Sequence, residues 1–89
     1  MEYGMIFATR GVADCAERNA TFRVELAAAF SRYCRGDWGE LCPEDWKQND
    51  QSVISGERVL GSYNTSVGKV WIITEWDRSS TTFLFPDEY

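Results

Sequence analysis

The chain contains no histidine, and this absence removes more chemistry than any other feature of its composition. Histidine is the side chain that titrates near neutral pH, and it is both the usual general base and the commonest metal ligand. Without it, neither a Ser-His nor a Cys-His nucleophile pair can form. The sequence therefore predicts a protein that is not an enzyme.

Cysteine is scarce, and long apolar runs are missing. The three cysteines have no paired spacing, and Cys34 and Cys42 stand alone, which disfavours a zinc site. The odd number favours reduced thiols, with a Cys15–Cys34 disulfide as the less favoured alternative. No segment has the pattern of a signal peptide or the length of a membrane span. We therefore expect a cytoplasmic protein that makes no membrane contact.

The charge is acidic and unevenly distributed. The formal net charge is −5 over 89 residues, enough chain for a single domain spanning 1–89. Residues 1–35 hold five arginines and four carboxylates, whereas residues 36–89 hold ten carboxylates and four basic side chains. An acidic half argues against direct nucleic-acid binding, which depends on Lys and Arg neutralising phosphates. It suits a basic protein partner, and solubility alone is the other explanation.

Two helices are predicted. An apolar stripe at helical spacing predicts the first, from residue 20 or 21 to 35, and consists of Phe22, Leu26, Ala29, Phe30 and Tyr33. Gly36 supplies its left-handed end, and residues 12–18 predict one or two earlier helical turns. Pro43 predicts the start of the second helix and Gly56 its end. Its narrower stripe of Trp46, Val53 and Ile54 predicts a half-exposed lid over the core.

The other elements are strands. β-Branched and aromatic residues predict them over 5–9, 57–63, 69–76 and 81–86, with turns at 64–68 and 77–80. The short connections predict a three-stranded antiparallel meander, to which the N-terminal strand adds as a fourth. The expected fold class is α+β, with two helices packed on one face of a three- to four-stranded, mainly antiparallel sheet.

The segment between the helices, residues 35–46, is the predicted recognition surface. Trp38 stands between two glycines, so it is either a plug into the core or an exposed anchor. Trp46 and Trp71 are predicted to lie in the core. The predicted partner-binding side chains are acidic apart from this tryptophan: Asp37, Trp38, Glu40, Glu44, Asp45, Asp87 and Glu88.

A second polar cluster consists of Glu75, Asp77 and Arg78 at a strand–turn–strand junction. It predicts a clamp in which the Arg78 guanidinium forks onto Asp37 or Asp45. The alternative is that Arg78 reaches a carboxylate or phosphate of a ligand.

The carboxylates also raise the question of a Mg²⁺ site. The favoured explanation is structural: Asp37 ties the loop, and Glu44 and Asp45 offset the positive end of a helix. We therefore expect neither a metal nor another cofactor.

Two blocks of the sequence carry a family likeness. They are Gly36-Asp-Trp-Gly-Glu-Leu-Cys-Pro-Glu-Asp-Trp-Lys-Gln-Asn49 and Lys69-Val-Trp-Ile-Ile-Thr-Glu-Trp-Asp-Arg-Ser-Ser-Thr-Thr-Phe-Leu-Phe-Pro-Asp-Glu-Tyr89. The chain resembles small uncharacterised proteins encoded on bacterial plasmids, integrative elements and prophages. Where their usual pattern has alanine after the glutamate, this chain has Trp76, which adds contact surface.

The resemblance implies an accessory protein of a mobile element. Such proteins often occupy a host defence protein, as anti-CRISPR and antirestriction proteins do. The first hypothesis is a non-enzymatic inhibitor that binds a nucleic-acid-handling defence complex through an acidic, Trp-containing face. The second is an antitoxin or regulatory subunit with a sheet edge or helix face left open for a dimer. The third is a small carboxylate-metal nuclease. Whether the protein is a monomer or a homodimer stays open.

Overall fold

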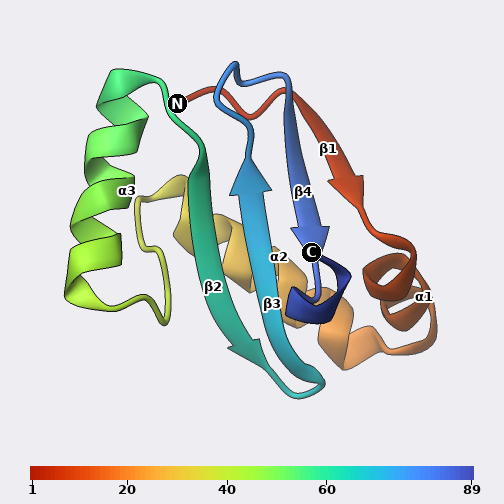
Figure 1. Ribbon diagram of the computed structural model, residues 1–89. Coiled ribbons are helices and arrows are strands. Elements are labelled where there is room, and N and C mark those ends of the chain that lie inside the picture. Colours follow the sequence, from red (N-terminus) through yellow and green to blue (C-terminus); the bar gives the residue numbers. More distant parts are fainter.

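The computed structural model describes all of residues 1–89 and shows a mixed sheet with a long helix behind it (Figure 1). The elements, in chain order, are β1 (Met5–Ala8), α1 (Arg10–Arg18), α2 (Ala20–Cys34), α3 (Pro43–Ser55), β2 (Val59–Thr65), β3 (Gly68–Thr74), β4 (Ser80–Leu84) and the 3₁₀-helix η1 (Pro86–Glu88). None of the helices combines the length and the apolar character that crossing a membrane requires.

The strand order across the sheet is β1-β4-β3-β2. The pairs β2–β3 and β3–β4 are antiparallel, and β1 lies parallel to β4. The expected α+β class and the three-stranded meander are confirmed, and the N-terminal strand does join the sheet as its fourth strand. As a result β1 and β2 are both edge strands.

Helix α2 agrees with its prediction to within one residue. Its stripe buries Phe22, Ala29 and Tyr33 against the back of the sheet. The Asn19 side chain caps its start by accepting a hydrogen bond from the Phe22 N–H at 3.0 Å. At its end, Gly36 adopts a φ of 78°, and the Gly36 N–H bonds the Tyr33 carbonyl in a Schellman-type cap.

Hydroxyl groups link the two layers inside the core. The Tyr33 hydroxyl shares a 2.6 Å hydrogen bond with the Thr74 hydroxyl, which in turn bonds Thr81 at 2.8 Å. Thr81 donates onward to the backbone carbonyl of Tyr3 at 2.7 Å. All three side chains in this relay are almost fully buried, so every polar group in it needs its partner.

Helix α3 occupies the predicted residues, and Trp46 and Val53 of its predicted stripe pack against the core, but Ile54 does not. The helix lies beside β2, at the edge of the sheet, while α2 crosses behind the sheet (Figure 1). Ile54, predicted to line its apolar stripe, is 81% exposed, whereas Asn49 and Ser52 are buried. A sheet edge presents backbone N–H and C=O groups, so polar side chains suit the inner side of a helix packed there.

The helices leave the front of the sheet open (Figure 1). Trp71, predicted to lie in the core, is only half-buried on this front face. The ring of Tyr89 packs edge-on against it, with centroids 5.8 Å apart. The segment before α2 also differs, since α1 is a helix of nine residues rather than one or two turns.

Candidate functional site

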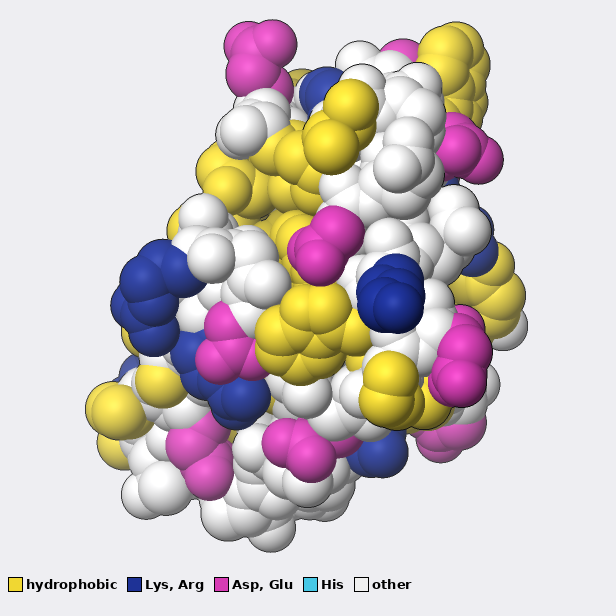
Figure 2. Space-filling view, turned by 90° about the vertical axis from the view of Figure 1, so that its left-hand side faces the viewer, with side chains coloured by type: hydrophobic (Ala, Val, Ile, Leu, Met, Phe, Trp, Pro, Cys, Tyr) yellow, Lys and Arg dark blue, Asp and Glu magenta, His cyan; other side chains and the backbone are white.

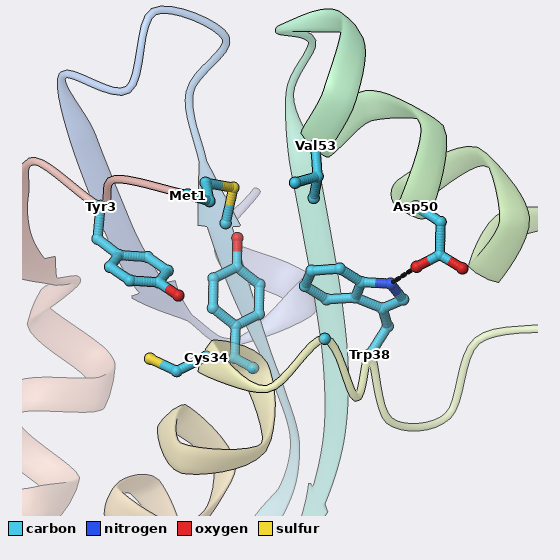
Figure 3. A pocket seen from close by; sticks show the side chains of 8 residues that line it. Met1, Tyr3, Cys34, Trp38, Asp50 and Val53 are labelled. Carbon is cyan, nitrogen blue, oxygen red and sulfur yellow. Dashed lines mark hydrogen bonds between the residues drawn. The ribbon is translucent and has the colours of Figure 1, made fainter.

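Trp38, at the centre of the predicted recognition segment, is a core plug. Its side chain is 2% exposed, and its ring lies edge-on to Tyr33 with centroids 5.3 Å apart. The indole N–H donates to the Asp50 carboxylate on α3 at 2.9 Å (Figure 3). The structure thus corrects the prediction of Trp38 as a contact residue, because a buried ring cannot meet a partner.

A small hollow of about 210 Å³ opens beside Trp38. It lies between α3, the end of α2 and the N-terminal segment (Figure 3). Its lining is mostly apolar, with Asp50 as the charged member: Met1, Tyr3, Tyr33, Cys34, Gly36, Trp38, Asp50 and Val53. Since Asp50 already accepts the indole N–H, the hollow presents few polar groups that are free to orient a ligand.

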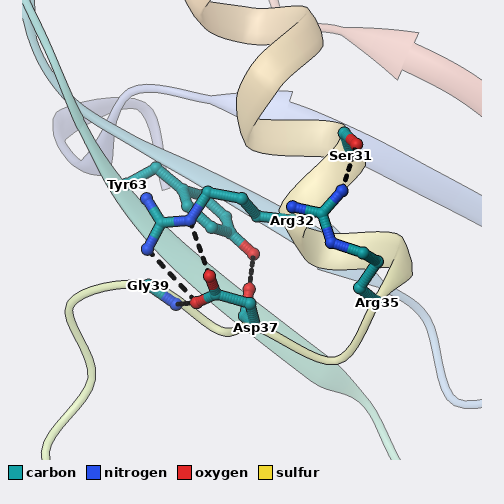
Figure 4. A network of polar contacts seen from close by, with 6 residues as sticks. All are labelled: Ser31, Arg32, Arg35, Asp37, Gly39 and Tyr63. Atoms are coloured by element: carbon teal, nitrogen blue, oxygen red, sulfur yellow. Dashed lines mark hydrogen bonds and ion pairs between the residues drawn. The ribbon is translucent and has the colours of Figure 1, made fainter.

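Asp37 is paired inside the protein (Figure 4). Its carboxylate accepts two hydrogen bonds from the Arg32 guanidinium, at 2.8 and 3.2 Å, and one from the Gly39 N–H at 3.0 Å. The Arg32 guanidinium holds the pKa of Asp37 below its usual range, although partial burial opposes this. The Tyr63 hydroxyl also donates to the Asp37 backbone carbonyl at 2.7 Å. Asp37 therefore ties the loop down, as the structural explanation of this carboxylate expected, while its predicted contact role stays a prediction.

The loop after Trp38 and helix α3 together cover the free edge of β2. The Ser62 N–H donates to the Trp38 carbonyl at 3.0 Å, and the Glu40 N–H donates to the Ser62 carbonyl at 2.7 Å. One turn of α3 continues this cover. The Asn49 side chain accepts from the Leu60 N–H at 3.3 Å and donates to the Leu60 carbonyl. The Asn49 side chain thus makes the two hydrogen bonds that a neighbouring strand would make. This pairing leaves the β2 edge closed to other chains.

Arg78 does link separate segments, as predicted, but it binds backbone carbonyls in place of the predicted carboxylates. The Arg78 guanidinium reaches neither Asp37 nor Asp45. It donates to three backbone carbonyls, those of Ser52 at 2.9 Å, Glu57 at 2.7 Å and Glu75 at 3.2 Å. The prediction was wrong because Asp37 is taken by Arg32, and the carbonyls at the end of α3 lie within reach instead.

The other two members of that cluster also have structural roles. Glu75 contributes its backbone carbonyl to Arg78. The Asp77 carboxylate accepts from the Ser79 N–H at 3.1 Å, and hydrogen bonding to Ser79, first through its side chain and then through this N–H, lowers the pKa of Asp77. Together they shape the turn between β3 and β4.

The predicted contact residues at the C-terminus are not brought near α3. They lie on η1, which follows β4, and β3 stands between β4 and the β2 edge. The Glu88 carboxylate accepts from the Thr9 hydroxyl at 2.6 Å and the Gly11 N–H at 3.0 Å, and the Thr9 bond lowers the pKa of Glu88. Glu88 therefore ties η1 to the start of α1, and both Asp87 and Glu88 are exposed.

The three remaining predicted residues, Glu40, Glu44 and Asp45, do come together at the start of α3. All three are exposed, and none forms an ion pair, since the ion pairs of the chain are Arg10–Asp14 and Arg32–Asp37. They share the surface with three apolar side chains. We call this surface the α3 corner and define it as Glu40, Leu41, Pro43, Glu44, Asp45 and Trp46.

Two shallow hollows meet at Leu41 in the α3 corner. One, of about 390 Å³, is lined by Leu41, Pro43, Trp46 and Lys47. The other, of about 230 Å³, is lined by Leu41, Asp45, Gln48, Asn49 and Leu60. Figure 2 views the molecule from the α3 side and shows acidic side chains interspersed with basic and apolar ones. The corner is thus a mixed surface of carboxylates and apolar hollows.

Trp46 is the tryptophan of this surface, and the sequence reasoning assigned it to the core. It is half-buried, packed on the core cluster at one side and lining a hollow at the other. The sequence feature that could have identified Trp46 as a surface residue is its place directly after Glu44 and Asp45 in the first turn of α3. No group of three or more Asp, Glu or Cys side chains in the structure is placed to hold a metal ion.

Comparisons with known proteins add little. No family model matches the chain, and no solved structure matches it. A partial likeness exists to macrophage receptor MARCO of Mus musculus, 35% identical over an alignment of 46 residues that covers 45% of this chain. The match spans 9% of the length of that receptor. So short a match shows no family membership.

Proposed function

We propose that this protein is a non-enzymatic binding protein whose α3 corner docks on a basic protein surface. The observation that carries the proposal is the group of three exposed carboxylates, Glu40, Glu44 and Asp45, which have no cation partner and of which Asp45 lines a hollow at Leu41. Unpaired carboxylates attract Lys and Arg side chains at long range, and the apolar hollows accept the side chains between them.

The α3 corner has the composition of a protein–protein contact site, with apolar side chains surrounded by charged ones. Tryptophan and leucine in shallow hollows act as anchors, and charged groups around them set orientation and the rate of encounter. Lys47 also lines one hollow, so one positive charge stands beside the three negative charges of the corner. A partner needs two or more basic groups near an apolar side chain.

The surrounding contacts hold this surface rigid. Trp38, Asp37 and Asn49 anchor the loop and α3 to the end of α2 and to β2. A surface that is already in its binding shape loses less conformational entropy on association. In this proposal these three residues position the site and do not touch the partner.

The resemblance to mobile-element proteins supports the identity of the partner class. We propose a nucleic-acid-handling defence complex of the bacterial host, whose basic groove normally binds phosphates. An acidic protein seated in that groove excludes the nucleic acid, which makes this protein an inhibitor. Two observations support this target: the resemblance to mobile-element proteins and the acidic charge of the chain. Both favour a partner with a basic surface.

The experiment is affinity capture from the host with three baits. The first is the wild-type chain, and the second carries Glu40→Lys, Glu44→Lys and Asp45→Lys. The third is a control with the same change in charge at the other end of the chain: Glu2→Lys, Asp14→Lys and Glu17→Lys.

We expect the wild-type chain and the control to capture the same nucleic-acid-handling complex, and the corner variant to lose it. Equal capture by the corner variant would contradict the proposed surface. A captured partner without any nucleic-acid-handling component would contradict the proposed target.

A further inference from the structure

Strand β1 is an edge strand that nothing covers. It lies on the outer side of β4, and no element flanks its other side (Figure 1). Its side chains are exposed although they are apolar: Met5 by 66%, Ile6 by 52% and Phe7 by 46%. The opposite edge, on β2, is blocked by Asn49 and the Trp38 loop. Edge strands usually carry charges or proline, and β1 has neither.

The backbone groups of β1 alternate between β4 and solvent. The Met5 N–H donates to the Ser79 carbonyl and the Thr9 N–H to the Phe83 carbonyl, both at 3.0 Å. Since alternate residues of a strand point the same way, the backbone of Phe7 also faces β4. The N–H and C=O groups of Ile6 and Ala8 therefore point to the free edge.

The surface around this edge is apolar as well. A hollow of about 340 Å³ opens between β1 and α2. Its lining consists entirely of hydrophobic residues: Ile6, Phe7, Ala8, Leu26, Ala27, Phe30 and Phe83. Apolar side chains that stay in water on a contiguous surface mark a contact site.

We propose that the occupant of this edge is a second copy of the chain, with the two β1 strands paired antiparallel about a two-fold axis at Phe7. In this register the outward groups are reciprocal, because Ile6 exchanges both backbone hydrogen bonds with Ala8 of the second copy. Phe7 then faces Phe7 of the second copy in a non-hydrogen-bonded pair, where cross-strand side chains approach most closely. Two four-stranded sheets become one continuous sheet.

The charges at the ends of β1 agree with this direction. Glu2 precedes the strand and Arg10 follows it, and Arg10 is held only loosely by Asp14 at 3.9 Å. Antiparallel pairing places the Glu2 end of one copy beside the Arg10 end of the other. Parallel pairing would place like charges together.

The available area predicts a weak dimer. The exposed parts of Met5, Ile6 and Phe7 amount to roughly 300 Å² in each copy, given about 150–250 Å² for a large side chain. The pair therefore buries about 600 Å² of side chain, plus the backbone of β1, which is below the roughly 1,200–2,000 Å² of stable specific interfaces. We expect a dimer that forms and dissociates with protein concentration.

The test is sedimentation equilibrium of the purified chain from micromolar to millimolar concentration. The wild-type chain should pass from monomer to dimer over this range. Phe7→Lys and Phe7→Glu should each stay monomeric, since the two-fold axis brings two like charges face to face. An equimolar mixture of the two variants should dimerise again, because opposite charges then meet. Ile54→Lys, at a more exposed site on α3, should dimerise as the wild-type chain does.

Ala8→Pro tests the backbone of the pairing. It removes an N–H that points to the free edge and leaves the β4 bonds of Met5 and Thr9 in place, so it should fold and remain monomeric. A wild-type chain that is monomeric at all concentrations would overturn the proposal. So would a dimer that tolerates both Phe7 variants, or a mixture of these variants that does not reassociate. None of these results depends on the α3 corner, so the proposed function is tested separately.

Discussion

Asn49 shows how one polar side chain organises the α3 side of the protein. It is 6% exposed and satisfies both backbone groups of Leu60, in place of a neighbouring strand. A helix residue that is buried and polar is unusual unless its partners are fixed. Asn49 therefore sets how α3, and with it the α3 corner, lies against the sheet.

Asn49→Ala should lower the free energy of unfolding by about 1–3 kcal/mol, because it leaves a buried N–H and C=O unpaired. Urea unfolding followed by circular dichroism measures this. Gln51→Ala, on the exposed side of the same helix, should change the value by less than about 0.5 kcal/mol. Equal effects of the two variants would show that the Leu60 contacts contribute nothing.

Arg78 combines a strained backbone with a three-way contact. Its φ of 61° makes it the only residue other than glycine in the left-handed region. Its guanidinium meanwhile joins the end of α3, the segment before β2 and the turn after β3. A non-glycine residue keeps such a φ when surrounding contacts stabilise it.

Arg78→Ala and Arg78→Gly separate the two effects. Both remove the three hydrogen bonds, so both should lower the melting temperature. Glycine accepts a positive φ without steric cost, so Arg78→Gly should be the more stable of the two by about 1 kcal/mol. Melting curves that match that of the wild-type chain would rule out the clamp, and identical curves for the two variants would rule out the strain.

At the scale of elements, the loop between α2 and α3 depends on two glycines with different tasks. Gly36 and Gly39 have nearly the same φ, 78° and 79°. A Cβ on Gly36 would meet nothing within 4 Å, whereas a Cβ on Gly39 would lie 1.9 Å from the Ser62 carbonyl oxygen. Gly36 ends a helix, and Gly39 lets the loop approach β2.

Gly36→Ala should therefore cost about 1 kcal/mol of stability, from the left-handed backbone alone. Gly39→Ala should cost more, because the loop must also move off β2 and take Trp38 with it. Thermal unfolding gives the two costs, and Trp fluorescence reports whether Trp38 becomes exposed. Equal costs would contradict the close approach at Gly39.

The sequence predicted the helices and strands where each element has its own local pattern. The stripe of α2 and its Gly36 end identify that helix, and the run from Val70 to Thr74 identifies β3. The burial of the polar residue Asn49 on the inner side of α3 was not explained in this way. Its partners are the backbone groups of Leu60, 11 residues away in sequence at the edge of β2.

The candidate site was predictable to a similar degree. The carboxylates Glu40, Glu44 and Asp45 were found because charge at a helix start is a local feature. Of the two alternatives for Trp38 the structure shows the core plug, and Trp46, expected in the core, is half-buried, since burial of a tryptophan depends on tertiary neighbours such as Asp50. The partner of Arg78 was missed for the same reason.

At the scale of the whole molecule, buried tyrosines couple the fold to alkaline pH. Burial raises the pKa of Tyr33 to about 12 and that of Tyr63 higher still. In the unfolded chain a tyrosine ionises near pH 10. Above that pH the unfolded state releases protons that the folded state keeps, so stability is full below pH 10 and falls as the pH rises towards the folded pKa.

The free energy of unfolding should thus decline by about 1.4 kcal/mol per pH unit for each such tyrosine above pH 10. Urea titrations at pH 9, 10 and 11 measure the slope. Tyr33→Phe is less stable at neutral pH through loss of the Thr74 bond, yet its stability should fall less steeply with pH. A slope equal to that of the wild-type chain would contradict the burial of Tyr33 as the cause.

The central claim is that the α3 corner is an electrostatic docking surface. The most direct measurement is the affinity of the captured partner for the wild-type chain and for the variant with Glu40→Lys, Glu44→Lys and Asp45→Lys, each over a series of salt concentrations. The variant should bind at least about tenfold more weakly at low salt, and its affinity should depend less on salt. An unchanged affinity and an unchanged salt dependence would contradict it.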